Sequence, residues 1–309
     1  MKKYVIGIDV GGTNVKLGIA GPSARIIARS LLNTKSFISH KSRLIAAIMA
    51  GVRALAGQAG VSFRDIAGIG IGLPGLVDFD KGLVIFLPNI PGWRKVPLKR
   101  MIQNELGLPV FLENDVNLIT LGEWQYGAGK GTRNMLCMTL GTGVGGGLIL
   151  DGRLYRGEGF VAGEIGHMPL NETGPACNCG GYGCFERSVG NLALLKKAAV
   201  IFRNKNITLE EITRRAKAGE RRSIAFWEDF AGHLGNGLVG VVNLLNPRRI
   251  VIGGGVANCP GFVFRIVKEI LRERAMRVQA SMVDVVRASL GNDAGILGAQ
   301  VLVRSGGER

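Results

Sequence analysis

The sequence predicts an α/β protein of two domains. Its 309 residues, of which 47% are hydrophobic and 20% charged, can bury a substantial core and suit two domains of ordinary size. Strand-like runs alternate with runs of apolar residues at helical spacing. A strand, a glycine-rich turn and a second strand occur together twice, within residues 4–20 and 135–152. This repetition suggests a duplicated fold.

The first of these hairpins turns at Asp9–Asn14, where backbone amides can cradle a phosphate group. Asp9, at the end of the first strand, could hold a magnesium ion directly or through water. Thr13 and Lys16 add a hydroxyl group and a cation near the same turn. A plain hairpin needs only the two glycines, so both interpretations stay open.

The second hairpin repeats this design at an offset of 130 positions. The offset aligns Gly11 with Gly141, Gly12 with Thr142 and Thr13 with Gly143. The glycines here also satisfy the dinucleotide-binding pattern G-x-G-x-x-G, but a strand and a turn follow where that motif requires a helix. We therefore reject a Rossmann site. Residues 129–132 likewise lack the residue order of a Walker loop.

Between the hairpins, residue spacing predicts a helix, a strand and a short helix, over Ser39–Leu55, Ile66–Leu73 and Pro97–Leu106. The segment Leu83–Trp93 begins as a strand and becomes a proline-rich loop. Asn89 in this loop is a candidate polar contact, and a rigid turn explains the loop equally well.

A strand over Val110–Leu112 delivers Glu113, Asn114 and Asp115 to its carboxyl end, and a helix follows. Such strand-to-helix junctions are where α/β enzymes place substrate-binding and proton-transfer groups. Asp115 is also a suitable N-cap for the helix. Both roles stay open at this point.

After the second hairpin the patterns predict five further helices and two strands. The helices span Leu192–Phe202, Leu209–Ala218, Ile224–Leu245 and Phe262–Arg274, the strands span Arg249–Ile252 and Met282–Arg287, and a helix over Ile296–Val303 ends the chain. We expect Gly232, Gly235, Gly237 and Gly240 to let their helix pack closely on a neighbour. Glycines 253–255 permit close approach of a flat ligand such as a nucleoside.

The segment from Gly163 to Glu186 brings one histidine and three cysteines together. The candidate ligands are His167, Cys177, Cys179 and Cys184, and this set matches a Cys3His zinc signature. A disulfide is the alternative, but a Cys177–Cys179 bridge would close a strained loop of one residue. Four protein ligands leave no position for a substrate, so we expect the metal to stabilise a loop and not to react.

The net charge of +16 raises the question of nucleic-acid binding. The basic residues are dispersed as pairs such as Lys196-Lys197 and Arg214-Arg215, which favours a solvated basic surface that also attracts an anionic nucleotide. The N-terminal residues lack a signal-peptide core, and no uncharged apolar run has the length of a membrane span. We therefore expect a cytoplasmic protein with no nucleic-acid partner and no membrane contact.

Together these motifs resemble those of the ROK family (repressors, open reading frames and kinases), whose sugar kinases have the actin-like ATPase (ribonuclease H-like) fold. The matching segments are Asp9-x-Gly-Gly-Thr-x-x-Lys16, Glu113-Asn-Asp-x-Asn117, Leu140-Gly-Thr-Gly-Val-Gly-Gly-Gly147, Gly163-Glu-Ile-Gly-His167, Cys177-x-Cys-Gly-x-x-Gly-Cys-x-Glu186 and Ile252-Gly-Gly-Gly-Val256. They cover essentially the whole chain, and their order makes the resemblance specific.

The resemblance implies two α/β domains with ATP and a sugar in the cleft between them. It assigns residues 1–114 and about 292–309 to an N-terminal domain and residues 115–291 to a C-terminal domain, each with one phosphate hairpin. Family members are often dimers or tetramers, so a homodimer or homotetramer is expected.

The resemblance also implies roles for single residues. Asp115 looks like the catalytic base. Sugar contacts are implied for Gly75, Asn89, Asn114, Asp115, Glu164, His167 and Glu186. Contacts to ATP and Mg²⁺ are implied for Asp9, Gly11, Gly12, Thr13, Asn14, Lys16, Gly141, Thr142, Gly143, Gly254 and Gly255. Structural Zn²⁺ would be bound by His167, Cys177, Cys179 and Cys184.

The implied activity is ATP-dependent transfer of a phosphoryl group to a hexose, with the 6-hydroxyl of glucose as the first expectation. N-acetylglucosamine and N-acetylmannosamine kinases of the family share these motifs and are the alternatives. A non-catalytic sugar-sensing regulator is the alternative from another class. The family's repressors carry an additional N-terminal DNA-binding domain, and because this chain starts at the first hairpin we expect an enzyme.

Overall fold

The computed structural model describes residues 2–33, 41–88, 90 and 92–307, and it contains two five-stranded sheets of identical topology. The first sheet consists of β1 (Tyr4–Val10), β2 (Asn14–Ala20), β3 (Ile26–Asn33), β4 (Ile66–Leu73) and β8 (Val110–Asn114), in the order β3-β2-β1-β4-β8. The second consists of β9 (Met135–Leu140), β10 (Val144–Leu150), β11 (Arg153–Tyr155), β12 (Arg249–Gly253) and β13 (Asp284–Arg287), in the order β11-β10-β9-β12-β13. In each sheet three antiparallel strands are followed by two parallel ones, which confirms the predicted duplication.

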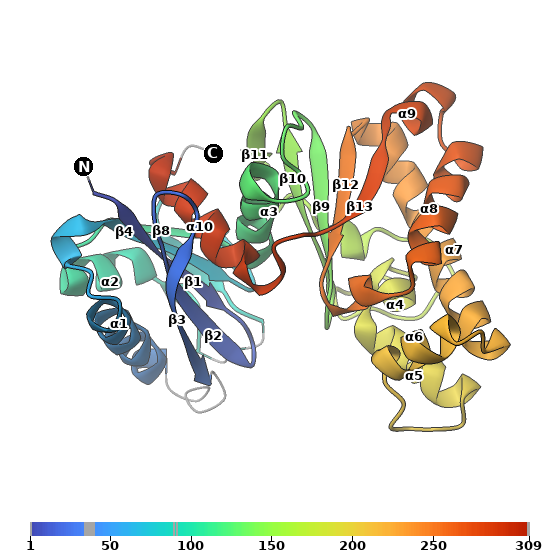
Figure 1. Cartoon of the computed structure of the whole chain (residues 1–309), viewed down its shortest axis with the longest axis horizontal. Helices are drawn as coiled ribbons and strands as arrows, with labels where there is room; N and C mark the ends of the chain where they lie inside the picture. Colours follow the sequence, from blue (N-terminus) through green and yellow to red (C-terminus); the bar gives the residue numbers. More distant parts are fainter. Residues whose placement is uncertain (1, 34–40, 89, 91, 308–309) are drawn as a thin grey trace.

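Helices cover the outer face of each sheet (Figure 1). The first sheet is covered by α1 (Lys41–Gln58) and α2 (Leu98–Leu106), beside a small sheet of β5 (Leu76–Asp78), β6 (Leu83–Phe86) and β7 (Arg94–Val96). The second half carries α4 (Glu186–Val189), α5 (Asn191–Ile201), α6 (Leu209–Lys217), α7 (Arg221–Leu245), α8 (Gly261–Arg274) and α9 (Arg277–Met282). Short 3-10 turns lie at η2 (Phe63–Asp65), η3 (Ile165–His167), η4 (Gly255–Asn258) and η5 (Gly291–Asp293). The predicted two-domain α/β fold is confirmed.

Two helices from distant parts of the chain, α3 (Asp115–Tyr126) and α10 (Ala294–Arg304), lie side by side between the two sheets (Figure 1). Helix α10 packs on β1 and β4, while α3 packs on β9 and β10. A Cβ atom on Gly298 would lie 1.7 Å from the Leu118 carbonyl oxygen, and one on Gly122 would lie 2.2 Å from that of Ala294. Glycine is therefore required where the helix backbones meet.

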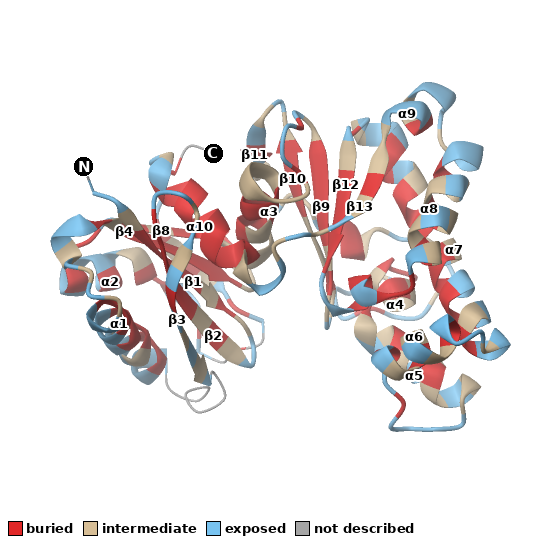
Figure 2. Ribbon diagram, viewed as in Figure 1, coloured by how far each residue is buried: buried red, intermediate tan, exposed pale blue. Residues whose placement is uncertain are grey.

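Each half has its own buried core, and a third core lies between the halves (Figure 2). The third core joins Leu118 and Leu121 of α3 to Leu302 of α10 and to residues such as Met135 and Val251 of the second sheet. Because burial of apolar surface is the main favourable term in folding, this core holds the two halves in contact.

Some predicted boundaries were wrong. Residues 277–282 form helix α9, so the last strand begins at Asp284 and not at Met282, and the terminal helix begins at Ala294, two residues earlier than expected. In α7, only Gly235 and Gly237 pack closely on neighbours, whereas Gly232 and Gly240 face open space. Apolar spacing alone does not tell which side of a glycine-rich helix faces a neighbour.

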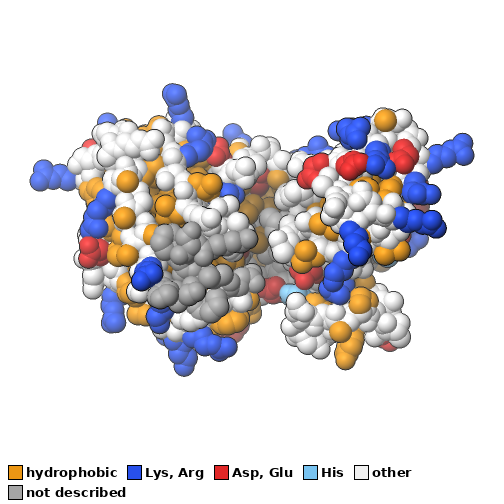
Figure 3. Space-filling view, turned by 90° about the horizontal axis from the view of Figure 1, so that it is seen from below, with side chains coloured by type: hydrophobic (Ala, Val, Ile, Leu, Met, Phe, Trp, Pro, Cys, Tyr) orange, Lys and Arg blue, Asp and Glu red, His pale blue; other side chains and the backbone are white. Residues whose placement is uncertain are grey.

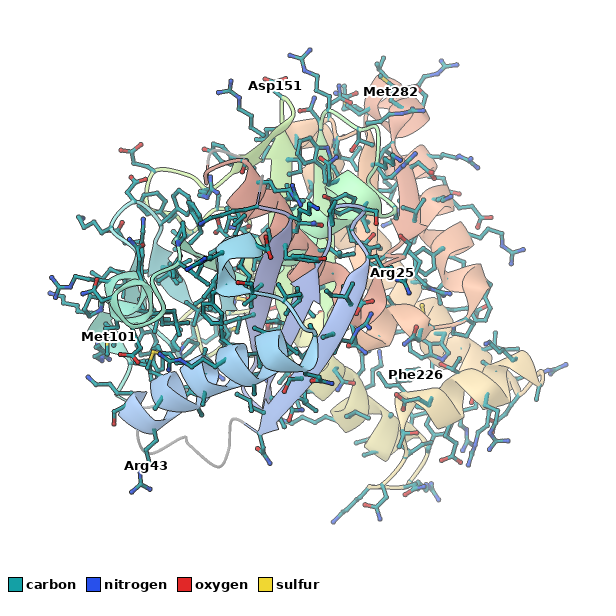
Figure 4. The ribbon with its side chains drawn as sticks, turned by 60° about the vertical axis from the view of Figure 1, so that its left-hand side comes forward. Arg25, Arg43, Met101, Asp151, Phe226 and Met282 are labelled. Atoms are coloured by element: carbon teal, nitrogen blue, oxygen red, sulfur yellow. The ribbon has the colours of Figure 1, made fainter. Side chains whose placement is uncertain are left out.

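The outer surface carries scattered basic side chains (Figure 3), and Arg43 on α1 projects away from the fold (Figure 4). This distribution agrees with the predicted solvated basic surface. Within the described part of the chain, the structure holds no helix that combines the length and the apolar character of a membrane span.

Candidate functional site

The carboxyl ends of three neighbouring parallel strands bring the candidate acidic residues together. The register pairs Asp9 of β1 with Gly72 of β4, and Gly72 with Glu113 of β8. Residues just beyond Glu113 therefore lie at the same sheet edge as Asp9. In α/β folds this edge is where ligands bind. Acidic and histidine side chains face the hollow between the two lobes (Figure 3).

The junction of β8 and α3 decides between the two roles left open for Asp115. Asn114 is the N-cap of α3: its Oδ1 accepts hydrogen bonds from the backbone N of Val116 at 2.9 Å and of Asn117 at 3.2 Å. The interpretation of Asp115 as the cap was therefore wrong, because the preceding residue has the extended backbone that a cap needs. The Asp115 carboxyl group is not required to start the helix.

The environment of Asp115 favours its protonated form. Burial is the main cause that raises the pKa of this carboxyl group, the negative charges of Asp9 and Glu164 add to it, and the Val116 backbone amide opposes them, so that the pKa is about 6. A carboxylate with a pKa near neutrality is well suited to accept a proton at physiological pH.

The turn of the first hairpin carries charged side chains. Gly11 N donates to Asn14 O at 2.8 Å across the turn. Lys16 Nζ lies 3.7 Å from Asp9 Oδ2 and 3.1 Å from Asn292 Oδ1. Burial raises the pKa of Asp9, and the neighbouring lysine partly opposes that rise. The turn thus presents amides, a cation and a carboxylate to one region.

The turn of the second hairpin is one residue shorter, since Leu140 pairs with Val144 where Val10 pairs with Val15. Glu186, at the start of α4, accepts a hydrogen bond from Val144 N at 2.8 Å through its Oε2. A Cβ atom on Gly143 would lie 2.5 Å from the same oxygen. The sequence did not predict this contact between Glu186 and the second hairpin, because 42 residues separate Glu186 from Val144.

A pocket of about 380 Å³ opens between the two hairpins. Its lining includes Lys16, Gly141, Gly254, Gly255 and Asn292. Gly254 has φ +83°, and a Cβ atom there would lie 2.3 Å from the Leu140 carbonyl oxygen. A glycine is therefore needed for the loop after β12 to approach the second hairpin.

The predicted metal ligands converge. One ligand atom from each of His167, Cys177, Cys179 and Cys184 lies within 4.8 Å of the others. Cys177 Sγ is 3.7 Å from His167 Nδ1, and the Sγ atoms of Cys179 and Cys184 are 3.6 Å apart. Tetrahedral coordination with Zn–S bonds of about 2.3 Å places sulfur atoms about 3.8 Å apart, so the donor set fits such an ion. The proposed disulfide alternative has no support, because all of these cysteines are free.

Backbone pairing connects this cluster to the two candidate sugar carboxylates. Leu170 N donates to Gly183 O and Phe185 N donates to Met168 O, at 2.9 and 2.8 Å. The segment that follows His167 therefore lies beside the segment that precedes Glu186. His167 Nε2 lies 4.0 Å from the exposed Glu164 carboxylate. The metal cluster can thus hold all three side chains at one place.

Of the remaining predicted residues, Gly75 lies beside the junction and accepts a hydrogen bond at 3.4 Å from Asn114 Nδ2. Its φ of +140° and the closeness of Phe86 O, 2.4 Å from a Cβ atom placed there, require glycine. Thr13 and Thr142 are exposed at the two turns. Asn89 lies outside the described residues.

Two buried acidic residues were missed as functional candidates. Glu113 is 3% exposed and pairs with Arg156, and Glu123 on α3 is fully buried. Glu123 accepts hydrogen bonds from the backbone N of Ala128, Ser289 and Leu290, so it fixes the chain that crosses from β13 to α10. An acidic residue on an apolar helix face was the available signal, since buried carboxylates require partners.

Comparison with known proteins identifies relatives along the whole chain. The model of the ROK family matches residues 5–305. A glucokinase of Halalkalibacterium halodurans is 34% identical over 318 residues, covering 98% of this chain and 95% of that protein. The xylose repressor of Bacillus subtilis is 32% identical over 238 residues, covering 77% of this chain and 61% of that protein.

Solved structures agree with the fold. The ROK hexokinase of Thermus thermophilus superposes with a TM-score of 0.81 at 34% identity, covering 96% of this chain and 97% of that one. A ROK glucokinase of Streptomyces griseus, solved in complex with glucose and AMPPNP, gives a TM-score of 0.80 at 32% identity, covering 98% and 99%. The predicted actin-like ATPase fold is thereby confirmed.

Proposed function

This chain belongs to the ROK family, and we propose that it is an ATP-dependent hexose kinase that phosphorylates the 6-hydroxyl of glucose. The observation that carries the proposal is the partly buried Asp115, which does not cap its helix and has a pKa of about 6. Phosphoryl transfer needs a positioned hydroxyl group, a carboxylate to accept its proton, and neutralisation of the phosphate charge. Asp115 takes the second role.

The sugar would lie between the β8–α3 junction and the metal cluster. The groups we assign to it are Gly75, Asn89, Asn114, Asp115, Glu164, His167 and Glu186. Gly75 offers its backbone atoms, and the side-chain oxygen and nitrogen atoms of the other residues can exchange hydrogen bonds with several hydroxyl groups of one hexose. Because a site built to pair hydroxyl groups rejects analogues that lack them, this set supports a sugar specificity.

The nucleotide would occupy the pocket between the hairpins, with its phosphates at the two turns and its nucleoside at Gly254 and Gly255. The turn residues assigned to it are Asp9, Gly11, Gly12, Thr13, Asn14, Lys16, Gly141, Thr142 and Gly143. Mg²⁺, when bound near Asp9, would supply charge neutralisation on the phosphate oxygens. Backbone amides and Lys16 contribute to the same neutralisation. We assign one side of this cleft to a domain of residues 1–114 and about 292–309, and the other side to a domain of residues 115–291.

We assign Zn²⁺ to the cluster of His167, Cys177, Cys179 and Cys184, whose donor atoms fit it. Such a closed site supplies stability and no open position for reaction. The role of these residues is to hold Glu164 and Glu186 in position.

Two alternatives stand beside this proposal. N-acetylglucosamine or N-acetylmannosamine kinase activity would use the same cleft. A non-catalytic sugar-sensing regulator is favoured by the similarity to the xylose repressor of Bacillus subtilis. Against the regulator, the chain retains Asp9, Lys16 and Asp115 together at one sheet edge.

A coupled assay of ADP release across a panel of hexoses and N-acetylhexosamines tests the proposal. We expect sugar-dependent ADP release that is fastest with glucose and requires Mg²⁺. The fastest rate with an N-acetylhexosamine would assign the alternative kinase activity. Sugar binding by calorimetry without ADP release from any sugar would assign the regulator.

A further inference from the structure

A buried ion pair joins the two halves of the molecule beside the candidate base. Glu113 immediately precedes Asn114 and Asp115, and Arg156 follows β11, the edge strand of the second sheet. Arg156 Nε lies 2.7 Å from Glu113 Oε2, and these side chains are 13% and 4% exposed. Charges removed from water in this way are stable only when they are paired and hydrogen-bonded.

The other carboxylate oxygen of Glu113 contacts the residues on both sides of Asp115. Glu113 Oε1 accepts hydrogen bonds at 2.9 Å from Asn114 N and from Asn117 Nδ2. Asn114 in turn caps α3. The carboxylate that Arg156 holds therefore orients the first turn of α3, to which Asp115 belongs.

The same arginine also closes the loop that leads to Glu164. Arg156 O accepts a hydrogen bond from Ala162 N at 2.9 Å, and Gly163 and Glu164 follow directly. Its guanidinium carbon lies 4.1 Å from the centroid of the Phe79 ring, a distance at which cation–π attraction is favourable.

Arg156 is thus held in place by side chains of the first half while its backbone belongs to the second. We propose that Arg156 is a positioning residue that sets Asp115, which directly follows the last strand of the first sheet, and Glu164 relative to one another, so that both meet one sugar. This inference rests on the proposed kinase function. Each half has a core of its own, so loss of the pair should disturb alignment more than folding. A misplacement of about 1 Å in a catalytic group can lower a rate about 10²-fold.

A double-mutant cycle of Arg156→Met and Glu113→Gln tests the inference, with Arg153→Met as the matched control. Arg153 is an exposed arginine of β11, three residues before Arg156, so its replacement removes the same charge without touching the pair with Glu113. Arg156→Met leaves Glu113 without its partner, and Glu113→Gln turns an amide donor toward the guanidinium group. In the double variant neither conflict remains, and the side-chain amide oxygen introduced at position 113 can still accept from Asn114 and Asn117.

We expect each single variant to lose about 10²-fold in kcat/KM for the sugar, with the KM for ATP unchanged. The double variant should recover at least tenfold of that loss, since removing both partners of a buried pair is less damaging than removing one. Arg156→Lys keeps the charge without the planar fork and should lie between the wild type and Arg156→Met. Arg153→Met should behave as the wild type.

Single variants with wild-type sugar kinetics would overturn the inference, as would a double variant no better than either single one. Failure of the proposed function would look different, because the wild type itself would then phosphorylate no sugar. In that case hydrogen exchange of residues 113–117 and 162–167 decides: faster exchange in both single variants with recovery in the double variant supports the inference, and unchanged exchange overturns it.

Discussion

The β1–β2 hairpin and the β9–β10 hairpin occupy the same place in two sheets of the same topology, yet their turns carry different chemistry. The first turn has a carboxylate and a lysine of its own, with Lys16 Nζ 3.7 Å from Asp9 Oδ2. The second turn offers backbone amides, and the carboxylate that reaches it, Glu186, comes from the distant segment that carries the candidate metal ligands. The two halves thus share the hairpin, while the charged groups at its turn come from different places in the chain.

This difference divides the proposed work between the halves. Asp115, the first residue of α3 and the residue that directly follows β8 of the first sheet, would take the proton. The metal cluster, Glu164 and Glu186, all after the second hairpin, would hold the sugar. Changes at the junction of β8 and α3 should therefore act on turnover, and changes in the metal cluster should act on sugar affinity.

The largest effect should come from Asp115→Asn, which removes the proton acceptor at the junction of β8 and α3. General-base catalysis contributes about 10²- to 10⁴-fold, so turnover should fall by that factor while sugar binding stays measurable. The helix should remain stable because Asn114 provides the cap. Steady-state kinetics and calorimetry check this, with the exposed Asp80→Asn as a control. Near-normal turnover in Asp115→Asn would contradict the assignment of proton transfer to Asp115.

The pH dependence of the wild-type reaction should reflect the titration of Asp115. Asp115 accepts a proton only as a carboxylate, so kcat/KM should fall about tenfold per pH unit below the pKa, which lies at about 6, and should level off above it. Glu164→Gln removes a negative charge that raises this pKa, so the acidic limb should move to lower pH. An acidic limb near pH 4 in the wild type would contradict the assignment.

Loss of the metal cluster should have a smaller effect, and that effect should be on the KM for the sugar. Cys177→Ser, or treatment of the wild type with a strong chelator, should raise the sugar KM about tenfold, because groups that orient binding residues typically contribute about 10- to 100-fold. The KM for ATP should change little, and added Zn²⁺ should restore the chelated wild type. Metal analysis that finds no zinc in folded, active protein would refute this prediction.

The smallest effect concerns packing of the second half. Gly232→Ala on α7 meets open space and should stabilise the protein by about 0.5–1 kcal/mol, since alanine is the better helix former. Gly235→Ala would place a Cβ atom 2.9 Å from Ile270 Cδ1. Overpacking of this kind costs about 1–3 kcal/mol, and chemical denaturation of the two variants measures the contrast. Equal stability of both would show that α7 and α8 adjust freely.

The sequence by itself determined the features that depend on neighbouring residues. Both glycine hairpins, the four metal ligands and the strand that ends at Asn114 were predicted from local patterns, because turn chemistry, ligand type and apolar period act over a few positions. The helix α2 is a further case, with Pro97 before its start and Gly107 at φ +66° after its end.

The tertiary structure alone decided what depends on contacts between distant segments. It made Asn114 the cap and left Asp115 available, paired Glu113 with Arg156 across 43 positions, and connected Glu186 to Val144 across 42. It also selected which glycines of α7 meet a neighbour. A buried charge acquires a partner only when folding brings the two side chains together, and residue spacing does not predict which distant side chains will pair.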